Sequence, residues 1–155
     1  PLFFLDYIAM AKLDRRQGLA LLRGIIEGCK RAGCALVGGE TAQMPGVYQP
    51  GEFDLAGFAV GSLRPAQAMP KEVPPESFLI GVGSSGFHSN GYSLLRTWAA
   101  KSRRKNWTRG LLEPTRIYVP HLLPLLEKNL ILGAAHITGS GFLNLPRMST
   151  AVDYE

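Results

Sequence analysis

The sequence has few cysteines and no long apolar run. Its two cysteines, Cys29 and Cys34, form neither a Cys-x-x-Cys pair nor a metal-binding quartet, so we expect buried free thiols. No stretch reaches the roughly 18 consecutive apolar residues that cross a bilayer. The apolar start Pro1–Leu5 has no basic segment and is followed at once by Asp6, unlike a signal peptide. We therefore expect a cytoplasmic protein with no membrane partner.

Charged residues are also few, at 19% of 155 residues, whereas hydrophobic residues make up 46%. This balance excludes a disordered chain, and the length suits one domain of ordinary size with a real core. The net charge is +5, and much of the excess lies in the run 101–109, near Trp98 and Trp107. Such a run is more often a solvated loop than a nucleic-acid site, so we expect no nucleic-acid partner.

Apolar periodicity predicts an α/β (α+β) chain. A helix from Asp14, its cap, to about Ala32 ends at Gly33, and its face of Leu19, Leu22, Ile26 and Cys29 is expected to be buried. The other expected elements are strands at 1–10, 34–38, 53–63 and 78–82 and helices at 90–102, 118–128 and 142–148. Residues 130–137 form a further apolar run. Pro124 predicts a kink or a late start of the helix over 118–128.

Gly38, Gly39, Glu40 and Thr41 follow the short apolar run that opens at Cys34. Glycines at the end of a strand let a ligand approach the main chain. A carboxylate and a hydroxyl there suit Mg²⁺, which prefers oxygen ligands and is often bound together with phosphates. A tight turn with a solvated Glu40 explains the same pattern, and spacing alone does not separate the two interpretations.

Two glycine-rich turns lie in the second half, at 81–86 and 138–141. Each follows an apolar run and precedes an expected helix, whose N-terminal N–H groups attract phosphate. The first turn matches Gly-x-Gly-x-x-Gly, but no acidic strand end follows about 20 residues later, which argues against a dinucleotide fold. No Gly-Lys-Ser/Thr follows either turn, which excludes a P-loop.

Histidine and aspartate residues near these motifs are candidates for chemistry. His88 and His136 suit acid–base work because histidine titrates near neutral pH, but each is also explained by a structural hydrogen bond. His121 lies among leucines and is expected to be structural. Asp6 suits a ligand, a cap or a partner for Lys12, and the sequence does not decide among them.

Four ordered motifs carry a family resemblance. The run GGETAQMPG at 38–46 resembles the GGETAEMPG signature of the phosphoribosylformylglycinamidine cyclo-ligase (AIR synthetase) family. PLFFLDY at 1–7, GSSGFHSNGYSL at 83–94 and HITGSGF at 136–142 are similar to further motifs of that family, in the same order. The resemblance covers almost the whole chain.

The resemblance implies an AIR synthetase-like architecture of two domains. Residues 1–64 are then the later part of an N-terminal domain that binds ATP, whose strands form a barrel across a homodimer. Residues 65–75, rich in proline, are a linker. Residues 76–155 open a C-terminal domain, a sheet with flanking helices, and a cleft between the two domains holds the substrate.

The same resemblance implies functions for particular residues. Gly38, Gly39, Glu40 and Thr41 align with the motif that binds ATP phosphates, with Glu40 as the Mg²⁺ ligand. Substrate contacts are implied for Ser84, Ser85, Gly86, Ser89, Gly91, Thr138 and Gly139, and catalytic functions for His88 and Asn90. The implied reaction closes the imidazole ring of formylglycinamidine ribonucleotide: ATP phosphorylates the formyl oxygen, and the amidine nitrogen then displaces phosphate.

Some features depart from the family pattern. Met10 and Ala11 replace a Thr-Gly pair, Gln43 replaces a glutamate, and Ser140 replaces a glycine. The family's upstream Asp-Gly-Val-Gly-Thr-Lys nucleotide loop is absent, so we expect the 155-residue chain alone to bind ATP weakly and to be inactive. The alternatives are another ATPase of the superfamily, of the FGAM synthetase or thiamine-monophosphate kinase type, and a non-catalytic fragment.

Overall fold

The structure, a computed structural model, describes residues 1–69, 72–102 and 108–154. The chain divides into two compact units. Unit 1 comprises Pro1–Arg64 with Ile117–Pro124, and unit 2 comprises Pro65–Arg116 with Leu125–Glu155. Within the described ranges, no helix combines the length and the apolar character needed to cross a membrane.

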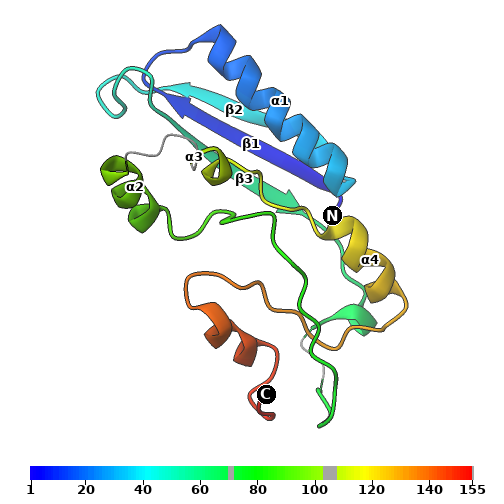
Figure 1. Cartoon of the computed structure of the whole chain (residues 1–155). Helices are drawn as coiled ribbons and strands as arrows, with labels where there is room; N and C mark the ends of the chain where they lie inside the picture. The colour runs from blue at the N-terminus through cyan, green and yellow to red at the C-terminus, as the bar shows by residue number, and fades with distance from the viewer. Residues whose placement is uncertain (70–71, 103–107, 155) are drawn as a thin grey trace. The chain divides into compact units, whose positions relative to one another are not determined.

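Unit 1 is a three-stranded mixed sheet with one long helix (Figure 1). Strand β1 (Phe3–Met10) is central, β2 (Ala35–Gln43) pairs with it in parallel, and β3 (Phe53–Val60) pairs with it in antiparallel fashion. Helix α1 (Arg15–Ala32) connects the two parallel strands, which need a crossover of this kind. The expected strands at 1–10 and 53–63 and the expected first helix are confirmed.

The ends of α1 have the predicted caps. The Asp14 carboxylate accepts a hydrogen bond of 2.6 Å from the Gln17 N–H, which satisfies one of the orphan donors at the helix start. Gly33 adopts φ 65°, a left-handed conformation that a residue with a Cβ adopts only at a cost. The Gly33 N–H donates to the Lys30 carbonyl at 3.1 Å and the Cys34 N–H to the Cys29 carbonyl at 3.0 Å. These two bonds define a Schellman motif.

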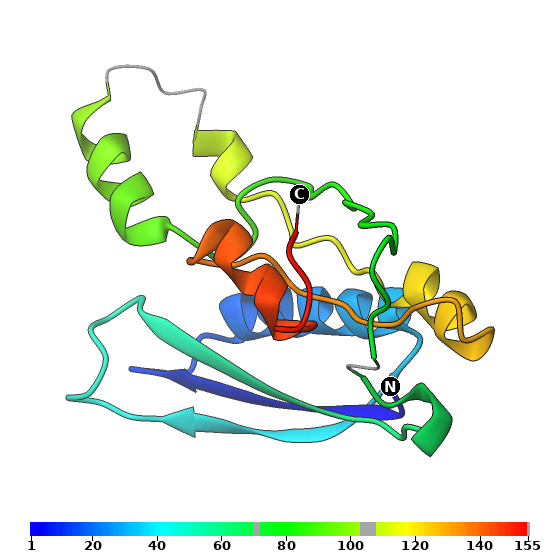
Figure 2. The same ribbon diagram turned by 90° about the horizontal axis from the view of Figure 1, so that it is seen from below.

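Helix α1 lies along one side of the sheet (Figure 2), and its buried face differs in part from the prediction. Cys29 is buried, as expected, and Leu22 is only half-buried. The prediction is wrong for Leu19, which is 45% exposed, and for Ile26, at 36%. Leu21 and Ile25, which lie outside the predicted face, are half-buried as well. Periodicity fixes the spacing of a helix face, whereas the neighbouring element decides which stripe is covered.

The centre of unit 1 is the C-terminal half of β1. Ile8, Ala9 and Met10 are each at most 4% exposed. The prolines and glycines between β2 and β3 form a loop over 44–52. In this loop the Met44 sulfur accepts a hydrogen bond of 3.7 Å from the Tyr7 hydroxyl, which ties the loop to the central strand.

Unit 2 contains short helices joined by irregular chain. Helix α2 (Tyr92–Lys101) lies in the range expected for it, and the 3-10 helix η2 (Gly141–Arg147) corresponds to the short helix expected near residue 142. The other helical segments are η1 (Pro65–Gln67) and α3 (Thr108–Leu111). Helix α4 (Val119–Glu127) contributes residues to both units. It begins before Pro120 and continues through Pro124, so the late start suggested for it is wrong.

The strand predicted at 78–82 is not formed. Phe78 is 96% exposed and Ile80 80% exposed, and no ladder partner for them exists among the described residues. A strand is stabilised by pairing, so an apolar run alone does not make one. The run 130–137 is likewise irregular. In the described part of unit 2 the expected sheet is therefore absent. Of the expected linker, residues 70–71 lie outside the described ranges, as do 103–107 of the basic run.

Candidate functional site

The motif Gly38–Thr41 lies inside β2 and not after it. Gly39 pairs with Asp6, Glu40 with Tyr7 and Thr41 with Ile8, and the pairing continues to Gln43. The expected strand end at residue 38 is therefore wrong, because pairing with β1 extends the strand past both glycines. The motif is presented from the edge of the sheet, since the strand order is β2-β1-β3.

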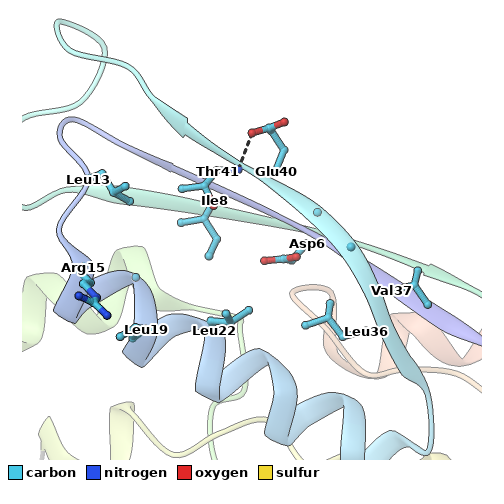
Figure 3. Close-up of a pocket in the computed structure, with 13 residues that line it drawn as sticks. Asp6, Ile8, Leu13, Arg15, Leu19, Leu22, Leu36, Val37, Glu40 and Thr41 are labelled. Atoms are coloured by element: carbon cyan, nitrogen blue, oxygen red, sulfur yellow. Dashed lines mark hydrogen bonds between the residues drawn. The ribbon is translucent and has the colours of Figure 1, made fainter.

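A register shift sets the direction of each side chain in the motif. The shift falls between Phe4 and Leu5, which pair with Leu36 and Gly38, so Val37 is the extra residue of a bulge. After the bulge, Gly39 shares a face with Asp6, and Glu40 lies on the opposite face. Figure 3 shows the Asp6 carboxylate between the sheet and α1, whereas the Glu40 carboxylate points away from the helix.

Gly39 is required by its neighbour Asp6. A Cβ at Gly39 would collide with the Asp6 carbonyl oxygen and the Asp6 carboxylate. The same row of the sheet has a second glycine, Gly57, as the partner of Asp6 on β3. Asp6 therefore lies between two glycines on one side of the sheet. The sequence left the function of Asp6 open, and only the strand register shows this arrangement.

A groove of about 680 Å³ lies between α1 and β2. Leu19, Leu22 and Leu36 form an apolar wall, and Asp6, Arg15 and Thr41 supply polar groups (Figure 3). Such a combination suits a small molecule with an apolar body and a few polar anchors. Arg15 and Leu19 of α1 belong to this groove, and no motif indicated either of them as a site residue.

Glu40 is exposed, and its Oε1 accepts a hydrogen bond of 2.9 Å from the Thr41 N–H. The carboxylate is an oxygen donor of the kind that Mg²⁺ prefers, whereas the Thr41 side chain lies on the opposite face of β2, toward the groove. Among the residues with described positions, no group of three or more His, Cys, Asp or Glu side chains could hold a metal ion. The chemistry of Glu40 thus fits Mg²⁺ as one ligand among several, with phosphate oxygens and water as the others.

In unit 2, the turn over residues 83–91 is held by His88. Its Nε2 accepts hydrogen bonds from the Ser85 N–H at 3.1 Å and from the Arg116 N–H at 3.4 Å, and His88 itself has φ 53°. The Ser85 hydroxyl donates to the Pro114 carbonyl at 2.7 Å. An Nε2 that accepts backbone hydrogen bonds has its ring proton on Nδ1. Nδ1 is thus the ring atom through which a neutral His88 donates a hydrogen bond.

Arg116 was not identified from the sequence. Its guanidinium donates to the Gly83 carbonyl at 2.9 Å, so Arg116 contacts the turn through its side chain as well as through its main chain. An arginine with no motif around it gives no local signal, and only the fold brings it to the turn. Asn90 is half-buried, Ser84, Ser89 and Gly91 are exposed, and α2 begins directly after Gly91 without a side-chain cap.

The second turn of unit 2 lies beside the first. The rings of His88 and His136 have centroids 6.4 Å apart. Thr138 donates through its hydroxyl to Asn144 Oδ1 at 3.3 Å, and Asn144 Nδ2 donates to the Gly141 carbonyl at 2.7 Å. Asn144 is fully buried, so these bonds satisfy its amide. Sequence reasoning missed Asn144, although it named Thr138 and Gly139.

The structure therefore groups the candidate residues into two sets. Unit 2 brings together the turns around residues 84–91 and 136–144, and unit 1 holds Gly38–Thr41 with the groove beside it. The functions expected for these residues, phosphate and Mg²⁺ binding in unit 1 and substrate binding in unit 2, stay predictions.

Comparisons with known proteins identify the class. Residues 1–63 match the family described as AIR synthase related protein, N-terminal domain, and residues 74–152 match the C-terminal domain of the same description. The chain belongs to this AIR synthase related family. Its mixed α/β composition and small mixed sheet fit the AIR synthetase-like architecture.

Curated relatives share about half of the residues. The chain is 50% identical over 158 aligned residues to a phosphoribosylformylglycinamidine cyclo-ligase of Desulfitobacterium hafniense, covering 96% of the chain and 47% of the relative. It is 48% identical to the enzyme of the same name from Polaromonas, covering 46% of that relative. The trifunctional purine biosynthetic protein adenosine-3 of Bos taurus is 48% identical, with 16% of its length covered. The chain spans about half the length of the single-function relatives.

Proposed function

We propose that the protein containing this chain is an ATP-dependent cyclo-ligase that converts formylglycinamidine ribonucleotide to aminoimidazole ribonucleotide in purine biosynthesis. The observation that carries the proposal is the match of 96% of the chain, at 48–50% identity, to enzymes named phosphoribosylformylglycinamidine cyclo-ligase. A cytoplasmic location is part of the same proposal.

The proposal assigns the nucleotide end of the reaction to unit 1. ATP, when bound with Mg²⁺, supplies the phosphoryl group that turns the formyl oxygen into a leaving group. Glu40 offers an oxygen donor for the cation, and exposed main chain at Gly38 offers an approach to phosphate. Catalysis of this kind rests on positioning and on neutralising charge more than on a protein nucleophile.

The proposal assigns the ribonucleotide to the two turns of unit 2. Ser84, Ser85, Gly86, Ser89 and Gly91 supply hydroxyl and main-chain N–H donors, joined by Thr138 and Gly139. The N–H groups at the start of α2 have no side-chain cap, which leaves them for an anion such as the ribose phosphate. His88 and Asn90 orient the substrate through hydrogen bonds, with Nδ1 of His88 as a donor.

We further propose that the protein is a homodimer joined through unit 1. By strand alternation, Phe58 and Val60 share the side of the sheet opposite α1. They are 61% and 40% exposed, and Phe58 is paired with Leu5. No helix in the described part of unit 1 covers this side. Burying such aromatic and branched side chains against a second copy supplies a hydrophobic driving force.

The proposed function is tested by substrate choice. The protein that contains this chain is incubated with Mg·ATP and one substrate at a time, and ADP is measured. We expect ADP release with formylglycinamidine ribonucleotide and none with thiamine monophosphate or with formylglycinamide ribonucleotide plus glutamine. Turnover of either alternative substrate in place of the first would assign the protein to another branch of the superfamily.

The assignment of the first turn is tested by a charge at Ser84. Ser84→Asp places a carboxylate where the proposal puts a phosphate, so the Michaelis constant for the ribonucleotide should rise about tenfold or more. Thr97→Asp adds the same charge on an exposed residue of α2 and serves as the control. An equal effect of the two changes would show that the turn is structural.

A further inference from the structure

The two cysteines of the chain meet at the end of α1. In the Schellman motif that ends this helix, Cys29 occupies the third position from the end and Cys34 the second position beyond it. These are the two positions whose side chains commonly touch. Figure 1 shows α1 leading directly into β2 at this point, and Ala35 opens that strand.

The backbone holds the two residues within reach of a disulfide. The Cys34 N–H donates to the Cys29 carbonyl at 3.0 Å. With standard bond lengths, this link keeps the two Cα atoms within about 7 Å, and disulfides join Cα atoms roughly 4.4–6.8 Å apart. The Cys34 side chain also lies close enough to Cys29 to help raise the pKa of the Cys29 thiol. Both thiols are free.

The environments of the two thiols differ. Cys29 is 7% exposed, whereas Cys34 is half-buried. Burial, the hydrogen bond and charge of Cys34, and the charge of Asp6 all raise the pKa of Cys29 above its ordinary value of 9.0. The thiolate is the reactive form, so Cys34 is the accessible nucleophile and Cys29 is the buried partner beside it.

We propose that Cys29 and Cys34 form a reversible disulfide across the C-cap of α1, by exchange with a low-molecular-weight disulfide of the glutathione type. This modification site is independent of the proposed enzymatic function. In a reducing compartment, disulfides that form at all are transient and sense the redox state, and a pair at a helix end suits that behaviour.

The exchange proceeds in two balanced steps. Cys34 loses its thiol proton, and its sulfur attacks one sulfur of glutathione disulfide, so a mixed disulfide forms and one glutathione thiolate leaves. Cys29 then loses its proton and attacks the Cys34 sulfur, which expels the second glutathione thiolate. The two protons pass to the leaving thiolates. Two protein thiols are oxidised, and one glutathione disulfide is reduced to two glutathiones.

Intact-mass measurement of the 155-residue chain tests the proposal. The folded chain is treated with glutathione disulfide, and remaining thiols are blocked with N-ethylmaleimide. We expect a monomer that has lost two hydrogens, carries neither glutathione nor maleimide, and returns to the starting mass with dithiothreitol. Addition of two glutathiones, a covalent dimer, or two free thiols after treatment would overturn the proposal.

Two variants test the order of attack. Cys29→Ser removes the buried partner, so it should stop at the mixed disulfide with one glutathione on Cys34. Cys34→Ser should react at least about tenfold more slowly than Cys29→Ser, because its remaining thiol is buried. Equal rates for the two variants would contradict the assignment. Far-ultraviolet circular dichroism checks that each variant is folded.

The urea-unfolded wild-type chain provides a comparison that needs no variant. At a fixed ratio of reduced to oxidised glutathione, the folded chain should hold more of the intramolecular disulfide than the unfolded chain, because the Schellman motif keeps the thiols together. A smaller or equal fraction in the folded chain would show that the cap geometry opposes the bond.

Discussion

The two neighbouring glycines of the motif should respond differently to the same substitution. A Cβ added at Gly39 would collide with the Asp6 carbonyl oxygen and carboxylate on the paired strand. The carbonyl is part of the central strand and cannot rotate away as a side chain can. A Cβ at Gly38 meets only Leu5 Cδ2, at 3.8 Å, which is an ordinary contact.

The magnitudes follow from these contacts. Overpacking of this kind costs about 1–3 kcal/mol. Alanine also restricts the unfolded chain, which stabilises by about 0.4–1 kcal/mol where the native conformation accepts it. Neither glycine has positive φ, so this gain applies to both. We expect Gly39→Ala to be destabilised by about 1–2 kcal/mol net, and Gly38→Ala to be neutral or slightly stabilised.

Urea unfolding of the 155-residue chain, followed by circular dichroism, measures the difference. With a denaturant dependence of about 1–3 kcal/mol per molar urea, the midpoints of the two variants should differ by roughly 0.5–2 M. The slopes should equal that of the wild type, which shows that only stability changed. Equal destabilisation by both substitutions, or none by Gly39→Ala, would refute the account of the Asp6–Gly39 contact.

Three further outcomes are expected. Asn144→Ala should lower the free energy of unfolding by about 2 kcal/mol, measured in urea, because it leaves the half-buried Thr138 hydroxyl and Gly141 carbonyl without their partner. An effect under 0.5 kcal/mol would contradict this. Asp14→Ala should cost about 1 kcal/mol and reduce helical circular dichroism, through loss of the bond to the Gln17 N–H, whereas Asp14→Asn should retain most of it. The raised pKa of Cys29 predicts stability that is fully present below pH 9.0 and is lost as the pH rises from there through the folded-state pKa. The thermal midpoint of Cys29→Ala should lack this decline. If the midpoints of the variant and the wild type follow the same pH profile, Cys29 is excluded as the source of the decline.

Local signals predicted the first helix well. Asp14 and Gly33 mark its ends by their own chemistry, and both act as the sequence indicated. The buried stripe was less predictable, because Leu19 has the helical spacing of the buried Cys29 and yet lines an open groove beside β2, where it is 45% exposed. The sequence contains the helical period of the apolar residues. How closely each of them packs against β1 and β2 depends on the tertiary structure.

The candidate site shows the same division. The sequence identified Glu40 and its glycines but placed them after the strand, because the pairing with Tyr7 that extends β2 joins residues far apart in the chain. The predicted strand at 78–82 failed for the converse reason, since apolar character without a paired neighbour does not make a strand. Arg116 and Asn144 reach the turns only in the folded chain, and neither belongs to a sequence motif that indicated it.

The central claim is tested most directly by the ATP dependence of ring closure at Glu40. In the native protein that contains this chain, formation of aminoimidazole ribonucleotide and of ADP is measured against Mg·ATP for the wild type, Glu40→Gln and Glu27→Gln. The Glu27 control removes an exposed carboxylate of α1 that pairs with Arg31 at 2.8 Å. We expect equal amounts of the two products in the wild type and the control, and a loss of about a hundredfold or more in kcat/KM for Mg·ATP with Glu40→Gln. Absence of the ring-closed product in the wild type, or unchanged ATP dependence in Glu40→Gln, would contradict the account.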